Sequence, residues 1–510
     1  MNEKYYITTP IYYVNDKPHI GHAYTTILAD VLSNYNKIIG KQTYFLTGTD
    51  EHGQKVESAA KEKNISPIEQ CNQTVVRFQD LWVKLGITNN DFIRTTEERH
   101  KKVVKLVLQE LFDKNEIYKG EYKGWYCESS ERFLTEKDLN DKDSPDYGRP
   151  VESIIESNYF FKMSKYQDWL IDYIEKNPSF IQPDFRANET LGFLKSKKLQ
   201  DLCISRPKKR LKWGIELPFD NDFVTYVWFD ALINYISSIG YKSDENLFNS
   251  LWPCSCHLIG KDILTTHTVY WPIMLKAMGL ELPKTIFAHG WWLMGKTKMS
   301  KSLGNVVNPM DLIEKYDVDS FRFFLLSEMT MGQDASFTED AFIKRYNADL
   351  ANDFGNLVNR VLNMINRYCE GKVPKYHYFD NDEEILWNGM QKSISFMKES
   401  ILNMKINSGI EKIMDSTRSI NKYLETKAPW TAYKNEKIKD VETTLYVSAE
   451  CLRLVSEILH PLMPNKMSIV KKSLGMTNNV VSLKEIGKFG QILVNSKINQ
   501  PNVLFPRIEI

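Results

Sequence analysis

The sequence has few cysteines and no C-x-x-C pair. Disulfide frameworks and zinc knuckles are built from paired or clustered cysteines, so we expect neither in this chain. Scattered thiols without disulfides are typical of a reducing cytoplasm, where we expect the protein to reside. The cysteines are Cys71, Cys127, Cys203, Cys254, Cys256, Cys369 and Cys451.

Long apolar runs and an excess of charge are also missing. No stretch approaches the length of a membrane-spanning helix, and residues 1–10 do not resemble a signal peptide, so we expect neither membrane insertion nor secretion. Because 66 basic residues nearly balance 65 acidic ones, any surface that binds nucleic acid must be local. A chain of 510 residues should divide into about three or four domains.

The most informative stretch is residues 10–23, which joins a predicted strand, Tyr5–Thr9, to a predicted helix. His19 and His22 fall in the first turn of that helix, on either side of Gly21. Backbone N–H groups at a helix start bind phosphate, and two imidazoles there add hydrogen-bond donors. The stretch therefore predicts a nucleotide site, with a metal pair or two surface histidines as alternatives. The helix is indicated by apolar residues at helical spacing, Ile20, Tyr24, Ile27, Leu28, Val31 and Leu32.

A second predicted strand, Lys41–Gly48, is followed by Asp50 and His52. Strand, helix and strand in about fifty residues predict a βαβ unit and a parallel sheet. Ligands of such sheets bind beyond the carboxyl ends of the strands, so Asp50 is placed to hold an ammonium group. Loop solvation or helix capping is the alternative for Asp50 and His52.

Two further strand–helix pairs are predicted after an irregular segment. The first is residues 224–230 followed by 231–236, and the second is residues 257–262 followed by 263–270. Residues 115–221, before them, are rich in glycine, proline, aromatic and charged residues. Such a composition is expected of an insertion between two halves of a sheet.

Lys298–Ser302 lies between Gly295 and Gly304. Flanking glycines and a cluster of cations are typical of a mobile loop that closes over phosphates. An exposed basic turn is the alternative for this segment.

After about Tyr346 the sequence becomes helical, and two apolar stripes predict an α-helical bundle. Asn356, Arg360 and Trp430 are poorly explained as bundle core. An amide, a guanidinium and an indole suit unpaired bases, although a tryptophan after a proline can also simply seal the bundle. The stripes are Leu350, Phe354, Leu357, Val358, Val361, Leu362 and Ile365, and Leu445, Leu452, Val455, Leu459 and Leu462.

His19–His22 matches the HIGH signature of class I aminoacyl-tRNA synthetases, and Lys298–Ser302 matches their KMSKS signature. With the residues around them, the chain resembles the methionyl-tRNA synthetase family from about Tyr5 to its C-terminus. The resemblance implies an α/β fold, a Rossmann-type parallel-sheet catalytic domain with a connective-peptide insertion, followed by an α-helical anticodon-binding bundle. The implied divisions are 1–115 and 223–295 for the two catalytic halves, 116–222 for the insertion, 296–345 for the KMSKS loop and stem-contact region, and 346–510 for the bundle.

The resemblance also implies which residues touch each ligand. Asp50 would hold the amino group of methionine, although Trp228 and Tyr235, on spacing alone, suit a core as well as a ligand pocket. The implied methionine contacts are Ile11, Tyr13, Asp50, Trp228, Ala231, Leu232, Tyr235, Ile263 and His267. The implied ATP contacts are His19, Gly21, His22, Gly260, Asp262, Lys298 and Lys301, of which His19, His22, Lys298 and Lys301 would be catalytic. The implied anticodon contacts are Asn356, Arg360 and Trp430.

The implied reaction joins L-methionine to tRNA(Met) through methionyl-adenylate, with Mg²⁺ entering with ATP. Other class I synthetases are an alternative, but those for isoleucine, valine and leucine carry a larger insertion, and the cysteine enzyme needs zinc ligands that are missing here. A synthetase-like tRNA-binding protein without catalysis is expected to have lost one of the two signatures. A small-molecule nucleotidyltransferase does not account for the KMSKS segment or the helical C-terminal third.

Zinc-bearing relatives carry four ligands in the segment that here runs from Cys127 to Tyr147, and only Cys127 remains. One thiolate cannot form a tetrahedral site, so we expect no structural zinc. Residues 504–509 resemble the end of the family's minimal form, without an appended dimerisation domain, which favours a monomer. The expected partners are ATP, L-methionine and tRNA(Met), with no membrane and no DNA.

Overall fold

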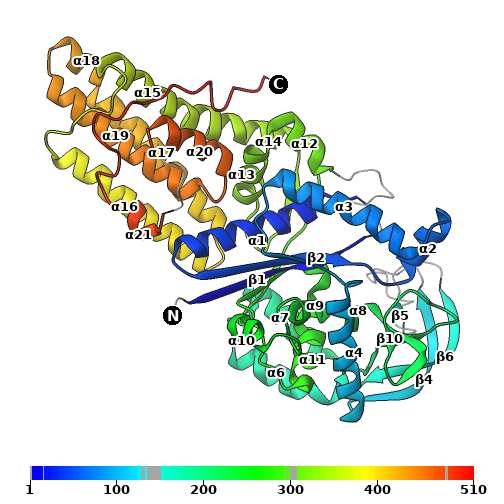
Figure 1. The fold of residues 1–510 in the computed structure, drawn as a ribbon. Coiled ribbons are helices and arrows are strands. Elements are labelled where there is room, and N and C mark those ends of the chain that lie inside the picture. Colours follow the sequence, from blue (N-terminus) through cyan, green and yellow to red (C-terminus); the bar gives the residue numbers. More distant parts are fainter. Residues whose placement is uncertain are drawn as a thin grey trace.

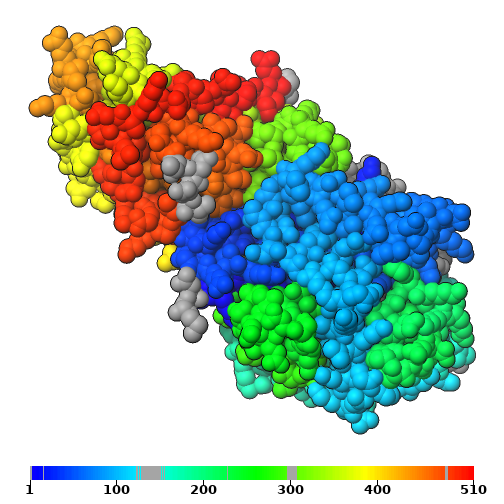
Figure 2. All heavy atoms as spheres, viewed as in Figure 1, coloured from blue at the N-terminus to red at the C-terminus, as the bar shows by residue number. Residues whose placement is uncertain are grey.

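The computed structural model describes residues 3–14, 17–127, 132–134, 151–295, 297–298, 307–476 and 481–509. An α/β part formed by the N-terminal two thirds of the chain packs against a helical C-terminal part (Figure 1). Figure 2 shows the two parts in contact along one side of the molecule. Within the described ranges, no helix combines the length and the apolar character needed to span a membrane.

A six-stranded sheet forms the centre of the α/β part, and all of its neighbouring strands run parallel. The βαβ prediction is confirmed, since β1 pairs in parallel with β2 through α1 (Ile20–Ile38). Chain order reverses between β1 and β12, and such a switch point is where open α/β sheets bind ligands. In spatial order, the strands are β3 (Asp91–Arg94), β2 (Gln42–Asp50), β1 (Lys4–Tyr13), β12 (Cys256–Gly260), β13 (Ile286–His289) and β7 (Ile181–Gln182).

Strand β1 runs four residues beyond the predicted end at Thr9. Proline usually ends a strand because it has no N–H to donate, and Pro10 suggests such an end. The pairing of β1 with β2 shifts register between Thr8 and Ile11, so Pro10 sits at a bulge and the strand continues. The extension brings Tyr13 level with Asp50, the last residue of β2.

The prediction of a strand over residues 224–230 is wrong. Strand β11 (Asp220–Thr225) ends earlier and belongs to a small antiparallel sheet, while α8 (Val227–Leu232) begins two residues later. Aromatic and β-branched residues favour strands only where a pleated surface is available. Here they pack in a buried helix, with Phe229 and Asp230 both fully buried.

An antiparallel sheet makes up much of the segment predicted as an insertion. The same segment also supplies β7, the last strand of the central sheet, so the predicted insertion is not structurally separate. The domain bounds themselves stay predictions. The antiparallel sheet has, in spatial order, β5 (Arg132–Leu134), β4 (Ile117–Cys127), β6 (Glu152–Phe161) and β8 (Leu202–Cys203).

Helices predicted for the C-terminal part form a bundle that is joined to α1. The guanidinium of Arg322 donates to Asp30 of α1 at 2.7 Å and to the carbonyl oxygen of Leu462 at 2.9 Å. Arg322 therefore joins the HIGH helix to the bundle through buried hydrogen bonds. The bundle helices are α15 (Asn356–Tyr368), α16 (Asn381–Leu402), α17 (Ile406–Lys427), α18 (Pro429–Lys434), α19 (Ile438–Leu459), α20 (Pro464–Ser473) and α21 (Leu483–Ile486).

The remaining elements cover the sheets or connect the two parts. On the N-terminal side they are α2 (Gln54–Glu62), α3 (Pro67–Leu85), α4 (Glu98–Asp113), η1 (Met163–Tyr166), α6 (Gln167–Lys176), α7 (Asp184–Ser196), β9 (Ser205–Pro207), β10 (Glu216–Leu217), α9 (Asn234–Ser237) and α10 (Glu245–Leu251). They continue with η2 (Lys261–Ile263), η3 (Thr266–Tyr270), α11 (Trp271–Met278), β14 (Trp292–Met294), β15 (Thr297–Lys298), α12 (Pro309–Tyr316), α13 (Val318–Glu328), β16 (Ala335–Phe337), α14 (Glu339–Arg345) and η5 (Tyr346–Gly355).

Replacing Gly48 with alanine should destabilise the sheet, because a Cβ there would lie 2.1 Å from the carbonyl oxygen of Ile93 on β3. A paired backbone atom cannot move aside, so we expect a loss of about 3 kcal/mol and a lower melting temperature by calorimetry. Gly192→Ala is the matched control, since a Cβ in that α7 position meets nothing within 4 Å and alanine favours a helix. Equal melting temperatures for the two variants would contradict the close approach of β2 to β3.

Candidate active site

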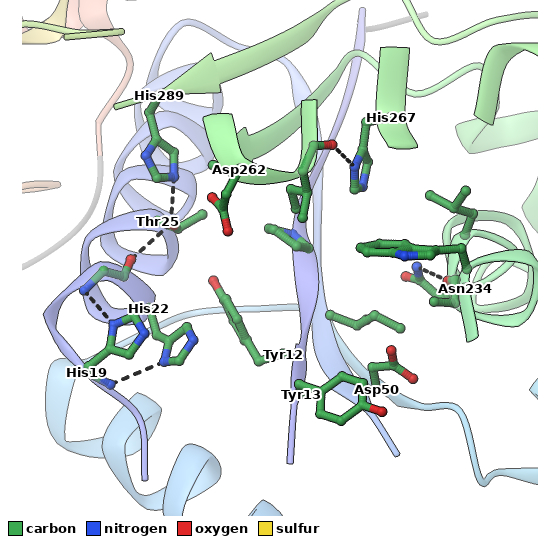
Figure 3. Close-up of a pocket in the computed structure, with 18 of the residues that line it drawn as sticks. Tyr12, Tyr13, His19, His22, Thr25, Asp50, Asn234, Asp262, His267 and His289 are labelled. Carbon is green, nitrogen blue, oxygen red and sulfur yellow. Dashed lines mark hydrogen bonds between the residues drawn. The ribbon is translucent and has the colours of Figure 1, made fainter. Parts of the chain in front are cut away.

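A cavity of about 460 Å³ opens at the carboxyl ends of β1, β2 and β12. Figure 3 shows His19, His22, Thr25 and His289 toward one end and Tyr13, Asp50, Asn234 and His267 toward the other. The cavity brings together candidates from five separate parts of the sequence. Those that line it are Ile11, Tyr13, His19, Gly21, His22, Asp50, Trp228, Ala231, Leu232, Tyr235, Gly260, Asp262, Ile263 and His267.

Two stacked imidazoles form the start of α1. His19 is the N-cap, and its Nδ1 accepts from the backbone N–H of Gly21 at 3.1 Å. A second hydrogen bond runs in the opposite direction, because Nδ1 of His22 accepts from the backbone N–H of His19 at 3.1 Å. With Nδ1 occupied as an acceptor, the proton of each neutral ring lies on Nε2. Both rings can therefore donate a hydrogen bond to an anion at the helix start.

His289 and Thr25 extend this end of the cavity, and the sequence did not single them out. Burial lowers the pKa of His289, so the ring is neutral. Its Nδ1 donates to the carbonyl oxygen of Gly290 at 2.7 Å, which leaves Nε2 to accept from the Thr25 hydroxyl at 2.7 Å. His289 is the last residue of β13, and ligands bind at the carboxyl ends of parallel strands, so this position could have been predicted as part of the site.

Asp262 presents a carboxylate between the two ends of the cavity (Figure 3). It follows Gly260, the last residue of β12, where a Cβ would lie 2.6 Å from the Asp262 Oδ1 atom. Glycine therefore allows the carboxylate to fold back against the strand end. The indole N–H of Trp291 donates to the same oxygen at 3.2 Å and orients the carboxylate. Such a group can accept hydrogen bonds from the hydroxyls of a sugar.

Asp50 and Tyr13 lie side by side at the ends of two paired strands, β2 and β1. Asp50 is buried, with 5% of its surface exposed, and faces the cavity. The Tyr13 hydroxyl donates to the carbonyl oxygen of His52 at 2.9 Å. A buried carboxylate that faces a cavity can accept hydrogen bonds from a cation there, so this corner is suited to an ammonium group.

An apolar wall lines the same cavity as Asp50 and is formed by Trp228, Ala231 and Leu232 of α8. Tyr235 and His267 line the cavity as well. Burial lowers the pKa of His267 to about 4, so the ring is neutral. Its Nδ1 donates to the carbonyl oxygen of Ile263 at 3.0 Å, and its Nε2 accepts from the Tyr235 hydroxyl at 2.7 Å. The wall can hold an unbranched apolar side chain.

Asn234, also missed by the sequence reading, lines the same end of the cavity. Its side-chain N–H donates to the carbonyl oxygen of Ala231 at 2.7 Å, which holds α9 against α8. Its Oδ1 is buried and accepts from no other group in the described part of the chain. Figure 3 places Asn234 beside the pocket wall, on the side away from His19.

The KMSKS candidates lie mostly beyond what the structure describes. Lys298 is in β15, whose backbone pairs with β14 through Leu293. Lys301 falls outside the described residues, and so do the rest of the signature and Gly304. The roles of both lysines stay predictions.

The anticodon candidates gather where α15, α17 and α18 meet. Asn356 is the exposed first residue of α15, and Trp430 on α18 is 37% exposed. Arg360 donates to the side chains of Asn421 at 3.1 Å and Glu425 at 3.4 Å, which fixes it against α17. An exposed indole and an oriented guanidinium suit unpaired bases, and the role of these residues stays a prediction.

The described ranges contain no group of three or more histidine, cysteine, aspartate or glutamate side chains that could hold a metal ion. Cys127 is buried, and residues 128–131 and 135–150 lie outside the description. The expected absence of zinc therefore stays a prediction. Cys256 begins β12, Cys254 lies two residues before it, and both are buried.

Comparison with known proteins identifies the family. A family model described as class I tRNA synthetases (M) matches residues 5–145 and 136–362, and one described as the anticodon binding domain of methionyl tRNA ligase matches residues 373–509. A methionine–tRNA ligase of Caldanaerobacter subterraneus is 42% identical over all of this chain and 80% of its own length. One of Rickettsia conorii is 42% identical over the full length of both chains.

The fold agrees with the same family. The structure of Mycobacterium tuberculosis methionyl-tRNA synthetase in complex with methionyl-adenylate superposes with a TM-score of 0.94 at 35% identity, covering 99% of this chain and all of that one. The predicted fold class, a parallel-sheet α/β part followed by a helical anticodon-binding part, is therefore confirmed. The chain belongs to the methionyl-tRNA synthetases, the methionine–tRNA ligases of class I.

Proposed function

We propose that the cavity forms methionyl-adenylate from methionine and ATP, and that the same cavity then passes methionine to tRNA(Met). One observation carries the proposal. A single cavity joins a buried carboxylate and an apolar wall at one end to a helix start with two imidazoles at the other. That order of groups matches an amino acid whose carboxylate points toward a nucleotide phosphate.

Methionine would bind with its ammonium group on Asp50 and its thioether along the α8 wall. The apolar wall offers no charge, so the side chain is selected by its length and shape. The buried carboxylate fixes the other end of the amino acid, which orients the methionine carboxylate for attack. Holding both reactants in this orientation lowers the barrier, because much of the translational and rotational entropy is already lost when the substrates bind.

ATP would place its α-phosphate near the start of α1 and its ribose hydroxyls on Asp262. Attack by a carboxylate oxygen of methionine forms a new O–P bond to the α-phosphorus and breaks the bond from that phosphorus to the bridging oxygen, so that pyrophosphate leaves with the electron pair. The Nε2 donors of His19 and His22 and the positive end of the helix would stabilise the negative charge that grows on the phosphate oxygens. Lys301, and secondarily Lys298, would add charge on the side of the departing pyrophosphate.

Magnesium would arrive with ATP as part of the substrate. The carboxylates of the described cavity lining are Asp50 and Asp262, which are proposed to bind the ammonium group and the ribose hydroxyls, and the groups at the start of α1 are imidazoles and backbone amides. Mg²⁺ prefers carboxylate, phosphate and water oxygens, so the nucleotide and water would hold it rather than a protein cage.

The second step needs the terminal ribose hydroxyl of the tRNA to attack the acyl carbon of the adenylate, which releases AMP. No covalent intermediate with the protein is required.

The test of the proposed activation step is methionine-dependent exchange of pyrophosphate with ATP, measured without tRNA and across the common amino acids. We expect exchange with methionine and little with the others. Exchange driven by a different amino acid would contradict the assignment of the apolar wall. No exchange with any of them would favour a tRNA-binding protein without catalysis.

Replacing Trp430 with alanine should weaken tRNA binding without affecting methionine activation. The indole is exposed on α18, far along the bundle from the cavity, and stacking on a base contributes about 1–3 kcal/mol. We therefore expect the KM for tRNA(Met) in aminoacylation to rise by roughly 5- to 150-fold, with pyrophosphate exchange unchanged. Tyr433→Ala, which removes another exposed aromatic of α18, is the control, and an equal effect from it would argue against a specific role for Trp430.

A further inference from the structure

A second buried carboxylate, Asp230, lies behind the apolar wall and does not line the cavity. Two histidines share it. Nδ1 of His52 donates to one carboxylate oxygen at 2.6 Å, and Nε2 of His100 donates to the other at 2.6 Å. All three side chains are almost completely buried. Although burial alone would raise the pKa of Asp230, its electrostatic and hydrogen-bond contacts with His52 and His100 hold it at about 2.

The carboxylate connects elements that are distant in the sequence. His52 follows the end of β2, His100 lies in α4, and Asp230 lies in the first turn of α8. The chain of contacts continues, because Nδ1 of His100 is 2.8 Å from the hydroxyl of Ser237 in α9. Asp230 therefore fixes the distance between the end of β2 and the two short helices that form the cavity wall.

Asp230 and its two histidines contact both sides of the proposed methionine pocket, the side of Asp50 and the side of α8. On one side, the carbonyl oxygen of His52 accepts from Tyr13, and His52 is two residues from Asp50. On the other side, Asp230 lies between Trp228 and Ala231 in the sequence, so the wall residues share its helix. The space left for the substrate side chain is the gap between these two sides.

A purely structural role explains the contacts less well than a positioning role. An apolar cluster of the same volume is generally at least as stabilising as a buried charged group, so stability alone does not call for a carboxylate and two imidazoles here. Directional hydrogen bonds do fix a distance and an orientation, which apolar packing does less sharply.

We propose that Asp230, His52 and His100 form a positioning clamp that sets the width of the methionine pocket and so its selectivity for side-chain length. The inference rests on the proposed function of the cavity. Asp230 acts through Tyr13 and the α8 wall and does not itself touch the substrate.

The test compares Asp230→Asn with the wild-type protein in pyrophosphate exchange, with methionine, ATP and the longer analogue ethionine varied in turn. Asparagine keeps the shape but offers only one acceptor oxygen, so one histidine loses its partner. We expect the KM for methionine to rise about tenfold and the KM for ATP to stay within about twofold. The preference for methionine over ethionine, which rests on one methylene, should fall by about tenfold as the wall loosens.

Glu450→Gln is the matched control, because Glu450 is also fully buried, accepts from Arg453 at 2.9 Å and lies in α19, outside the cavity lining. The two variants should lose comparable thermal stability, but only Asp230→Asn should change selectivity. If Asp230→Asn does not fold, His100→Gln, which keeps a neutral donor, should show the same loss of selectivity to a smaller degree. Equal selectivity in the wild type and the variants would overturn the clamp.

Failure of the clamp can be told from failure of the proposed function by including Asp50→Asn. Normal selectivity in the Asp230 variant together with a severe methionine defect in Asp50→Asn would reject the clamp and leave the site assignment intact. An unchanged KM for methionine in Asp50→Asn would remove the assignment on which the clamp rests.

Discussion

Replacing Asp50 with asparagine is expected to reduce methionine-dependent pyrophosphate exchange by roughly 10²- to 10⁴-fold in kcat/KM. Asp50 is buried at the end of β2 and is proposed to meet the ammonium group of methionine. Removing one partner of a buried charge pair costs about 3–5 kcal/mol, because the remaining charge has left water without compensation. The loss should fall mainly on the KM for methionine, since the ammonium contact is already made in the ground state.

Asp262→Asn provides the matched comparison, because it changes a second carboxylate of the same cavity in the same way. Asp262 is proposed to bind the ribose hydroxyls, so its loss should raise the KM for ATP and leave that for methionine almost unchanged. Steady-state exchange with each substrate varied in turn separates the two effects. A defect shared equally between both substrates in both variants would mean that the cavity is not divided as proposed.

The parts of the site that can be predicted from the sequence are those marked by a short motif or by the local order of strands and helices. The HIGH segment joins a strand to a helix start, and the turn of helix that separates His19 from His22 follows from four residues alone. Asp50 was placed by the general rule for parallel sheets, which needs only the order of strand, helix and strand. Local pattern and sheet topology place both at the ligand-binding edge of the sheet, whereas the preference for an ammonium contact over loop solvation at Asp50 rests on the family resemblance.

Features that depend on three-dimensional packing cannot be predicted from such local patterns. The bulge at Pro10 extends β1 to Tyr13, and proline by itself predicts the opposite. Residues 224–230 have strand-like composition, but only Val224 and Thr225 lie in a strand, and from Val227 the chain forms a buried helix. The distance in sequence between His100 and Asp230 gives no hint that they share a hydrogen bond.

Replacing His19 should separate its two roles, because it both caps α1 and faces the cavity. Asparagine is a good N-cap but does not place a donor where the imidazole Nε2 lies, whereas alanine supplies neither function. We expect both His19→Asn and His19→Ala to slow adenylate formation by roughly 10²- to 10³-fold, as for other donors to a developing negative charge. Only the alanine variant should also lose about 1 kcal/mol of stability.

The two readouts are pre-steady-state adenylate formation and thermal unfolding of the same preparations. A donor that acts on charge developing in the transition state lowers kcat more than it raises the KM for ATP, so the asparagine variant should bind ATP almost normally. Full activity in His19→Asn with reduced activity in His19→Ala would show that His19 matters only as a helix cap. In that case His22, whose Nδ1 is already engaged by the backbone of His19, would be left as the donor of this motif to the phosphate.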